Sequence, residues 1–519
     1  MKSKPCKQAA NVLMAKAKPA AAVPMQTQFQ LAVSFHSQGR WQDAAVLYDS
    51  IIAAQPGHAD AWHMRGMLHA QAAEYAQAVK LISQAISLDT TKSAYFNNRG
   101  LAQLSQQNFA EALSDFQQAI ALEPGLAQAH CNLGNVLQEM FRHEEALLSF
   151  DRAIALQPDY ADAYFNRANL QVLMNRPDKA ITDFDQALVI HPEDEDFKYN
   201  KATALLLNGA YEQAWNLHES RWRRVSTKHN HRQFDLPQWF GYESILGKTI
   251  LIHAEQGLGD TLQFIRYVPM VAARGAKVIV EVQAPLLNLF KNMQGISVLL
   301  KKGDPLPAFD VHCPMMSLPL AFKTTLDSIP ACPHFVILDM KKRYWADKLG
   351  LKEKLRVGLT WRSGFHPDKP DSMKAYERRN LPLQQLKALA DIDVEFFSLQ
   401  KGEPAESEFR QTVAACWDGP LINDQVHELN DFSDTAALIM NLDLVISVDT
   451  STAHLAASLG KPVWLLNRYD ACWRWLLYRE DSPWYPSIKI YRQTSAGDWD
   501  SVLEIVKKDL LSFSTTFTM

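Results

Sequence analysis

The chain has 519 residues, which is too long for one ordinary domain and predicts two to four. A hydrophobic content of 47% and a charged content of 21% are those of a folded, soluble protein. The net charge of -4 gives no general attraction to nucleic acid or to an anionic membrane. No stretch reaches the roughly 18 uninterrupted apolar residues of a membrane span. We therefore expect partners other than nucleic acid and no membrane span.

Residues 1–24 are rich in alanine, lysine and proline, and Lys16 and Lys18 interrupt every apolar run, so no secretory segment is predicted. We interpret this stretch as a flexible leader. The six cysteines are scattered, with no Cys-x-x-Cys pair and no zinc-type spacing. They predict reduced thiols, a cytoplasmic location and no metal site. They are Cys6, Cys131, Cys313, Cys332, Cys416 and Cys472.

Residues 25–222 carry a repeat with a period of 34. A bulky residue follows each repeated alanine by four positions, a small residue precedes it by twelve, and proline keeps the same step in four units. This is the tetratricopeptide pattern, in which small residues let two helices approach and the bulky one fills the groove between them. We predict about six units, as opposed to a helical bundle with accidental spacing. The alanines are Ala44, Ala78, Ala112, Ala146, Ala180 and Ala214.

Tetratricopeptide arrays bind peptides or proteins and seldom carry out chemistry, so this half predicts docking of a partner or acceptor. Residues 223–240 are predicted to be a linker. The basic run from Arg221 to Arg232 at its start is interpreted as solvated rather than as a second docking patch.

From about residue 240, short apolar runs alternate with helical stretches, which is typical of βαβ units and a parallel sheet. A charged, helix-prone stretch, 339–355, separates two such groups. We expect two Rossmann-like lobes, residues 241–338 and 339–519, with a cleft between them. The candidate strands are 249–254, 277–282, 309–313, 356–361, 394–399 and 444–449.

The first lobe opens with the segment HAEQGLGDTLQFIRY. Gly257 and Gly259 directly follow a strand, and Asp260 begins a helix. A dinucleotide fingerprint would need a third glycine where Leu262 stands, and no Walker lysine is present, so both of those sites are disfavoured. The glycines predict a tight turn that lets a ligand approach the backbone. Asp260 either caps the helix or points into the cleft.

Two further strands of the second lobe end in polar residues. Ser363 and Gly364 follow one of them, and Gln400 and Lys401 follow the next. Between them lies a cationic loop that either closes over a pyrophosphate through charge-assisted bonds or is simply solvated. Its cations are Lys369, Lys374, Arg378 and Arg379.

The stretch SVDTSTAHLAASLGKPVW places an acid, three hydroxyls and a histidine at one strand-to-helix corner. Helix capping needs only one or two such residues, and a helix N-terminus is an anion site. Ligands of open α/β sheets gather at the carboxyl ends of strands. The corner therefore predicts ligand binding in addition to capping, by Asp449, Thr450, Ser451 and His454, with Thr452 beside them.

These motifs resemble those of a glycosyltransferase of the GT-B fold, in the heptosyltransferase-like family nine. The resemblance covers residues from about 235 to 512, and its segments match the tetratricopeptide-fused branch of that family. The pairing with repeats is also similar to the eukaryotic protein O-linked N-acetylglucosamine transferases. The fold expected is a tetratricopeptide α-solenoid followed by a two-lobed Rossmann-like GT-B domain. The segments are EQGLGDTLQFIRY, SLQKGE, SVDTSTAHLAASLGKPVW and WRWLLYREDSPWYPS.

The resemblance implies that a nucleotide sugar binds the second lobe. Asp449, Thr450 and His454 would then face the diphosphate or the donor sugar, and Gln400 with Lys401 would contact the nucleotide. Ser363 and Gly364 would line the phosphate pocket, and Asp260 is the candidate base. The chain departs from the heptosyltransferases at WRSG, residues 361–364, where a lysine-bearing strand end is common.

The expected reaction is transfer of a sugar, with inversion, to a protein or glycan acceptor docked by the repeats. It needs one carboxylate to take the proton and a positive site for the departing diphosphate. The Asp-x-Asp spelling at Asp391 and Asp393 is interpreted as a turn, so no metal and no cofactor beyond the donor are expected. The alternatives are a non-catalytic scaffold with a nucleotide- or glycan-binding half, and a phosphorylase or epimerase on the same fold.

Overall fold

The computed structural model describes residues 24–225, 227, 232–364 and 373–517. The described residues form two compact units, and the division falls between residues 166 and 167. No helix among the described residues is both long enough and apolar enough to cross a membrane. The predicted leader, residues 1–24, lies outside the described residues except for its last position.

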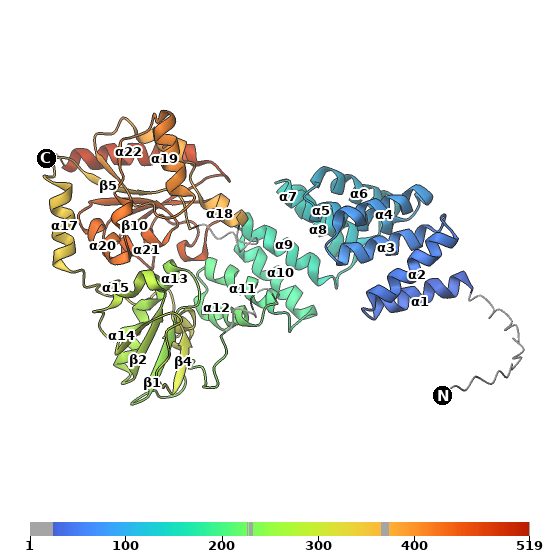
Figure 1. The fold of residues 1–519 in the computed structure, drawn as a ribbon, viewed down its shortest axis with the longest axis horizontal. Coiled ribbons are helices and arrows are strands. Elements are labelled where there is room, and N and C mark those ends of the chain that lie inside the picture. Colours follow the sequence, from blue (N-terminus) through green and yellow to red (C-terminus); the bar gives the residue numbers. More distant parts are fainter. Residues whose placement is uncertain (1–23, 226, 228–231, 365–372, 518–519) are drawn as a thin grey trace, which may run out of the picture. The chain divides into compact units, whose positions relative to one another are not determined.

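The first unit consists of successive antiparallel helix pairs (Figure 1). Its helices are α1 (Met25–Ser37), α2 (Trp41–Ala54), α3 (Ala59–Gln71), α4 (Tyr75–Leu88), α5 (Ser93–Ser105), α6 (Phe109–Leu122), α7 (Ala127–Glu139), α8 (His143–Leu156) and the start of α9 (Ala161–Leu173).

The repeat pattern forms these pairs as expected. A methyl group on Gly100 would lie 2.7 Å from the ring of Phe116, and one on Gly134 would lie 2.6 Å from the ring of Phe150. The small residue of one helix thus makes room for the bulky residue of the next, as the spacing predicts. All six of the repeated alanines are fully buried.

The second unit begins inside α9 and contains the last repeats as well as the sheets. These repeats are formed by α10 (Pro177–Ile190), α11 (Glu195–Leu207), α12 (Tyr211–His218) and the 3-10 turn η1 (Glu219–Trp222). Tyr211 and Trp215 of α12 belong to the same apolar core as residues of both sheets. The repeat pattern therefore ends near residue 222, whereas the compact unit that holds the sheets starts at residue 167.

The first lobe is a four-stranded parallel sheet in the order β3-β2-β1-β4 (Figure 1). Strand β1 pairs with β2 from Thr249 opposite Lys277 to His253 opposite Glu281. The strands are β1 (Thr249–His253), β2 (Lys277–Val282), β3 (Val298–Lys301) and β4 (Val311–Pro314). The helices are α13 (Leu258–Phe264), α14 (Val268–Ala273), α15 (Leu287–Phe290) and α16 (Leu318–Ala321), with 3-10 turns η3 (Ile265–Tyr267), η4 (Ala284–Leu286) and η5 (Met315–Ser317).

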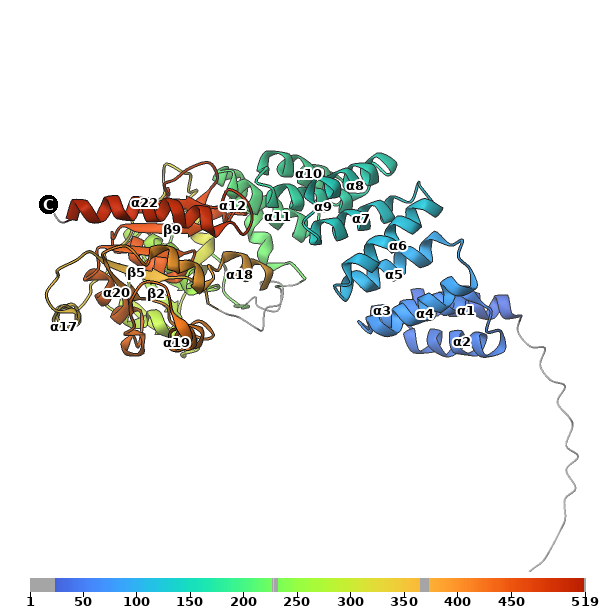
Figure 2. The same cartoon turned by 90° about the horizontal axis from the view of Figure 1, so that it is seen from above.

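The second lobe is a six-stranded parallel sheet in the order β10-β9-β8-β5-β6-β7. Its strands are β5 (Arg356–Thr360), β6 (Glu395–Ser398), β7 (Ile422–Asn423), β8 (Leu444–Val448), β9 (Val463–Asn467) and β10 (Ile488–Arg492). The helices are α17 (Asp339–Leu349), α18 (Met373–Arg379), α19 (Ala405–Cys416), α20 (Phe432–Met440), α21 (Ser451–Ser458) and α22 (Trp499–Phe517), with 3-10 turns η7 (Leu383–Leu389), η8 (Val426–Glu428) and η9 (Trp473–Trp475). The long helix α22 runs along one side of this lobe (Figure 2).

The predicted fold class, an α-solenoid followed by two lobes of parallel α/β structure, is confirmed. All six candidate strands are present, and α17 occupies the charged stretch between the lobes. The interpretation of the basic run as solvated is wrong at Arg221, which is buried in an ion-pair network with Glu219 and Glu255. Residues 226 and 228–231 of that run lie outside the described residues.

Candidate active site

Both lobes contribute to one cavity of about 540 Å³. The first lobe supplies the turn that follows β1 and Gln283 after β2, and the second supplies the segments that follow β5, β8 and β9. Since these are parallel strands, their carboxyl ends meet at the cavity. The lining residues are Gln256, Gly257, Leu258, Gly259, Asp260, Gln283, Ser363, Gly364, Arg379, Asp449, Thr450, Ser451, His454, Cys472 and Arg474.

Asp260 lies in the first turn of α13 and is engaged on both carboxylate oxygens. Its Oδ2 accepts a hydrogen bond of 2.9 Å from the N–H of Gly257, which caps the helix. Its Oδ1 accepts a hydrogen bond from Nη2 of Arg474, which belongs to the second lobe. Asp260 therefore caps α13 and also lines the cavity, so the two alternatives drawn from the sequence do not exclude each other.

Arg474 lies in η9 and joins the two lobes. Besides Asp260, its Nε donates to Oε1 of Gln263 at 2.8 Å. Burial opposes the charge of this guanidinium, but Asp260, Cys472 and Asp449 together outweigh it and raise the pKa of Arg474 above its ordinary value. A permanently cationic side chain therefore lies at the wall of the cavity.

The second-lobe corner uses a hydroxyl as its cap. Thr450 precedes α21, and its Oγ1 accepts a hydrogen bond of 3.3 Å from the N–H of Ala453. Asp449 stands one residue earlier, with Oδ2 3.6 Å from Nε of Arg379. Burial raises the pKa of Asp449, but the nearby cations, Arg379 first, bring it below its usual value. The acid at this corner is therefore ionised without serving as the cap.

His454 lies one turn into α21 and is held from both lobes. Its Nδ1 is 2.9 Å from the hydroxyl of Tyr485, and a methyl group on Gly259 would lie 2.9 Å from its Cδ2. Burial lowers the pKa of His454 to about 4, although Asp449 partly opposes the shift. The imidazole is therefore neutral near pH 7, and only glycine fits where the first-lobe turn crosses it.

Two of the predicted residues lie at strand ends outside the cavity lining. Gln400 accepts hydrogen bonds on Oε1 from the N–H groups of Trp361, at 3.1 Å, and Arg362, at 2.8 Å. It thereby fixes the segment that leads to Ser363 and Gly364, which do line the cavity. Lys401 donates from Nζ to the carbonyl of Val426 at 2.9 Å.

Only part of the cationic loop belongs to the described residues. Arg378 pairs with Asp470, with 3.1 Å between Nε and Oδ2, and Arg379 faces Asp449. Lys369 lies outside the described residues, and the side chain of Lys374 is not described either. The prediction that this loop closes over a pyrophosphate therefore stays a prediction.

The Asp-x-Asp spelling forms a turn before β6. Asp391 pairs with Lys507, and Asp393 pairs with Lys354, both at the surface. In the part of the chain that the structure describes, no three His, Cys, Asp or Glu side chains form a group that could hold a metal ion.

Sequence reasoning did not single out Arg474, although the segment WRWLLYREDSPWYPS that contains it carried part of the resemblance. Gln256, Leu258, Gln283 and Cys472 were also not expected at the cavity. Arg474 lies 214 positions from Asp260, and no local pattern connects two residues so far apart. The signal that could have pointed to Arg474 is a cation inside a motif that carried the resemblance.

Comparison with known families finds repeats in the first half and a transferase segment in the second. Residues 35–97, 104–140, 127–160 and 161–194 match tetratricopeptide repeats. Residues 391–481 match glycosyltransferase family 9 (heptosyltransferase). The chain thus combines tetratricopeptide repeats with a glycosyltransferase family 9 segment. That segment contains the Asp449 corner and Arg474, while Asp260 lies before it.

Among curated proteins, FlbA of Caulobacter vibrioides is 26% identical over 341 residues, which are 60% of this chain and 54% of that protein. The chain thus spans about half the length of this relative. Among solved structures, a tetratricopeptide protein of Thermus thermophilus, TTC0263, is 21% identical with a TM-score of 0.32. The match covers 35% of this chain and 100% of that one. The pilus biogenesis factor PilW is 18% identical with a TM-score of 0.37, over 39% of this chain and 94% of that one.

Proposed function

We propose that the chain is a glycosyltransferase of the GT-B type, which moves a sugar from a nucleotide-sugar donor to a protein or glycan acceptor docked by the repeats. The observation that carries the proposal is the convergence of Asp260, from the first lobe, with the Asp449 corner, from the second, on one cavity. A carboxylate for the acceptor proton and cations for the departing diphosphate are the two requirements of sugar transfer with inversion.

The donor diphosphate would bind the second lobe. Arg379 and Arg474 lie at the wall of the cavity, and the N–H groups at the start of α21 favour an anion. Ser363 and Gly364 would line the same phosphate pocket. Ser451 would offer its backbone and hydroxyl to the phosphates.

The remaining donor contacts follow from hydrogen-bond chemistry. Asp449, an acceptor beside Thr450, would bind a hydroxyl of the donor sugar. His454 would present a neutral ring, and Gly257 with Gly259 would let the donor approach the backbone. Gln400 and Lys401 would contact the nucleotide, for which Lys401 would exchange the Val426 carbonyl for the ligand.

Asp260 would act as the general base. A carboxylate has about four lone-pair positions, and Gly257 and Arg474 take two of those on Asp260. Capacity is left for a hydroxyl of the acceptor. Such a base contributes about 10²–10⁴-fold to the rate. The proton leaves the acceptor as its oxygen attacks the anomeric carbon, and the bond to the diphosphate breaks on the opposite face.

We further propose that neither a metal ion nor another cofactor takes part, since Arg379, Arg474 and the α21 N-terminus supply positive charge for the leaving group. The repeats of the first unit would dock the acceptor. A cytoplasmic location is proposed because Cys131, Cys313, Cys332 and Cys472 are free thiols, which a reducing compartment maintains.

The test is release of nucleoside diphosphate by the full chain from a panel of nucleotide sugars, with and without a chelator. We expect turnover with at least one donor, unchanged by the chelator. Asp449→Ala should weaken binding of that donor in calorimetry, whereas Asp393→Ala, at an exposed aspartate outside the cavity lining, should not. Equal donor affinity in both variants would remove the assignment of this corner.

The acceptor role of the repeats has its own test. Deletion of residues 1–158 cuts before α9 and leaves the second unit whole. We expect donor hydrolysis to persist and transfer to the natural acceptor to be lost. Undiminished transfer would refute docking by the first unit. Donor binding without turnover in the full chain would instead favour the non-catalytic scaffold.

A further inference from the structure

The last repeat ends in a turn whose charged residues point into the first lobe. Arg221 of η1 is 4% exposed and lies beyond the last helix of the repeat pattern, α12. A lone arginine would not be stable at such a depth, because a buried charge needs hydrogen-bonded partners. The contacts of Arg221 therefore indicate which part of the first lobe this turn stabilises.

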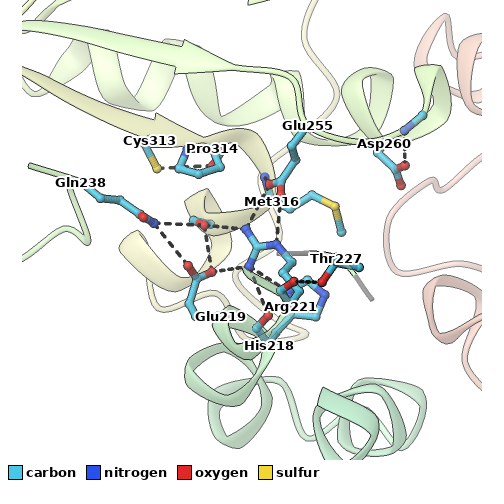
Figure 3. Close-up of polar contacts among 12 residues, drawn as sticks. His218, Glu219, Arg221, Thr227, Gln238, Glu255, Asp260, Cys313, Pro314 and Met316 are labelled. Carbon is cyan, nitrogen blue, oxygen red and sulfur yellow. Dashed lines mark hydrogen bonds and ion pairs between the residues drawn. The ribbon is translucent and has the colours of Figure 1, made fainter. Parts of the chain in front are cut away.

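All five N–H donors of the Arg221 guanidinium are used (Figure 3). Nε and Nη2 each donate to one oxygen of Glu255 at 3.0 Å, in a two-pronged pair. Nη2 also donates to Oγ of Ser317 at 2.7 Å. Nη1 donates to Oε1 of Glu219 at 2.6 Å and to the carbonyl of His218 at 3.2 Å. A fully satisfied network of this kind rigidifies what it joins.

The neighbouring groups complete the network. Ser317 donates from Oγ to Oε1 of Glu219 at 2.8 Å, and Gln238 donates from Nε2 to Oε2 of Glu219 at 3.2 Å. The N–H of Met316 donates to Oε1 of Glu255 at 3.0 Å. Burial opposes the charge of Arg221, but Glu255 and Glu219 outweigh it and raise its pKa. The cation is therefore fixed by two carboxylates.

Glu255 is the residue through which this network reaches the cavity. It lies in the turn of residues 254–260, directly after Ala254, and only Gln256 separates it from Gly257, the cap of the helix that carries Asp260 (Figure 3). Gln283 holds the next carbonyl, that of Gln256, at 2.8 Å. The turn thus has an anchor at Glu255, which is not itself among the residues that line the cavity.

The same repeat also contacts the segment that carries Arg474. The rings of Trp215, in α12, and Trp473 are 5.9 Å apart, edge to face. The guanidinium of Arg474 lies 4.4 Å above the Trp473 ring. Tyr211 accepts a hydrogen bond of 2.9 Å from Nε1 of Trp484. Both partners of the Asp260–Arg474 pair are therefore supported by the last repeat.

We propose that Arg221 is a positioning residue: the last repeat fixes the turn of residues 254–260, and with it Asp260, through the Arg221–Glu255 pair. This rests on the proposed function, because the turn matters for transfer only if Asp260 is the base. A displacement of about 1 Å at a reacting group can cost about 10²-fold in rate. Arg221 thus acts on the reaction through Glu255 and does not touch the substrate.

The test compares Arg221→Lys and Glu255→Gln with the parent, in the full chain. Lysine keeps the charge but loses the two-pronged geometry, and glutamine keeps the shape but loses the charge. Arg99→Lys is the matched control, because Arg99 forms the same two-pronged pair with Asp115, at 2.8 and 2.7 Å, within the first unit. The readouts are amide hydrogen exchange of residues 254–260, kcat and KM for donor hydrolysis, and the melting temperature.

We expect both variants, unlike the control, to exchange the amides of residues 254–260 faster and to lose about 10²-fold in kcat with little change in KM. Unchanged exchange and unchanged kcat in folded variants would overturn the proposal. Failure of both variants to fold, with Arg99→Lys folded, would also overturn it, because the pair would then serve global stability. Faster exchange of this turn in a chain whose parent shows no turnover would contradict the proposed function instead, and leave the support of the turn by Arg221 established.

Discussion

The two strand-to-helix corners that meet at the cavity contain similar residues but bond them differently. At the first corner the acid itself, Asp260, caps α13 and also pairs with Arg474 of the other lobe. At the second corner Thr450 caps α21, so that Asp449 is relieved of capping and faces Arg379. An acid after a strand can therefore cap the helix, as Asp260 does, or remain free of capping where a hydroxyl such as that of Thr450 caps in its place.

The largest effect is expected at the first corner. Asp260→Asn keeps the size and an acceptor for the Gly257 N–H but cannot take a proton. We expect kcat to fall by about 10²–10⁴-fold, with nucleoside-diphosphate affinity kept, measured by product release and calorimetry. Asp393→Asn, at an exposed surface pair, is the control. Comparable turnover in Asp260→Asn and the parent would show that Asp260 is not the general base, and neither corner would then supply one.

Acid should destabilise the folded chain at the second corner, because His454 is buried there in its neutral form. His454 has a pKa of about 4 in the folded chain against an ordinary value of 6.5. Between those pH values the unfolded chain binds a proton there that the folded chain does not. The free energy of unfolding is therefore unaffected above pH 6.5 and decreases by up to about 3 kcal/mol as the pH drops to about 4.

His454→Gln should reduce this acid sensitivity, measured as the difference in melting temperature between pH 7 and pH 4.5. His427→Gln, at an exposed histidine, should leave the difference as it is in the parent. An equal acid response in His454→Gln and the parent would indicate that the ring titrates normally.

Arg379 contacts the acid of the second corner, with 3.6 Å between its Nε and Oδ2 of Asp449. Arg379→Met should weaken nucleoside-diphosphate binding about 10–100-fold, since a hydrogen bond to a charged group contributes about 1.5–3 kcal/mol. Calorimetry at two salt concentrations measures it, and the loss should shrink at high salt. Arg410→Met, at an exposed pair with Glu406, is the control. Affinity that does not change would place the phosphates elsewhere.

The smallest effect concerns the contact between the corners. A methyl group at Gly259 would lie 2.9 Å from the His454 ring. Gly259→Ala should therefore lower the free energy of unfolding by about 1–3 kcal/mol, as overpacking does. Gly57→Ala adds a methyl group where no atom lies within 4 Å and should cost less. Denaturant titration of both variants compares them, and equal stability would mean that the turn yields without strain.

The sequence predicted the repeats and six of the ten strands that the structure describes, because both depend on local periodicity; β3, β7, β9 and β10 were not among the candidates. Ala112, Phe116 and Gly100 illustrate this, since spacing alone identifies which of them meet. Short or partly polar strands gave weaker signals: β7 has only two residues, and Lys489 interrupts β10.

Contacts between distant segments were beyond such patterns. The Asp260–Arg474 pair joins residues from different lobes, and Arg221 appeared to belong to a solvated basic run because its partner Glu255 is 34 positions away. Gln400 is a second example: its Oε1 accepts hydrogen bonds from the backbone of the neighbouring segment, a contact that the pattern did not predict.

We propose that the two corners form one binding site for a nucleoside diphosphate. Amide hydrogen exchange of the full chain, with and without whichever of UDP, GDP, ADP and CDP it binds, tests this directly. We predict slower exchange on binding in two separate stretches, residues 256–263 and 449–455, and no change in the repeats of the first unit. Protection of neither stretch by a bound nucleotide, or of a different region alone, would contradict the claim.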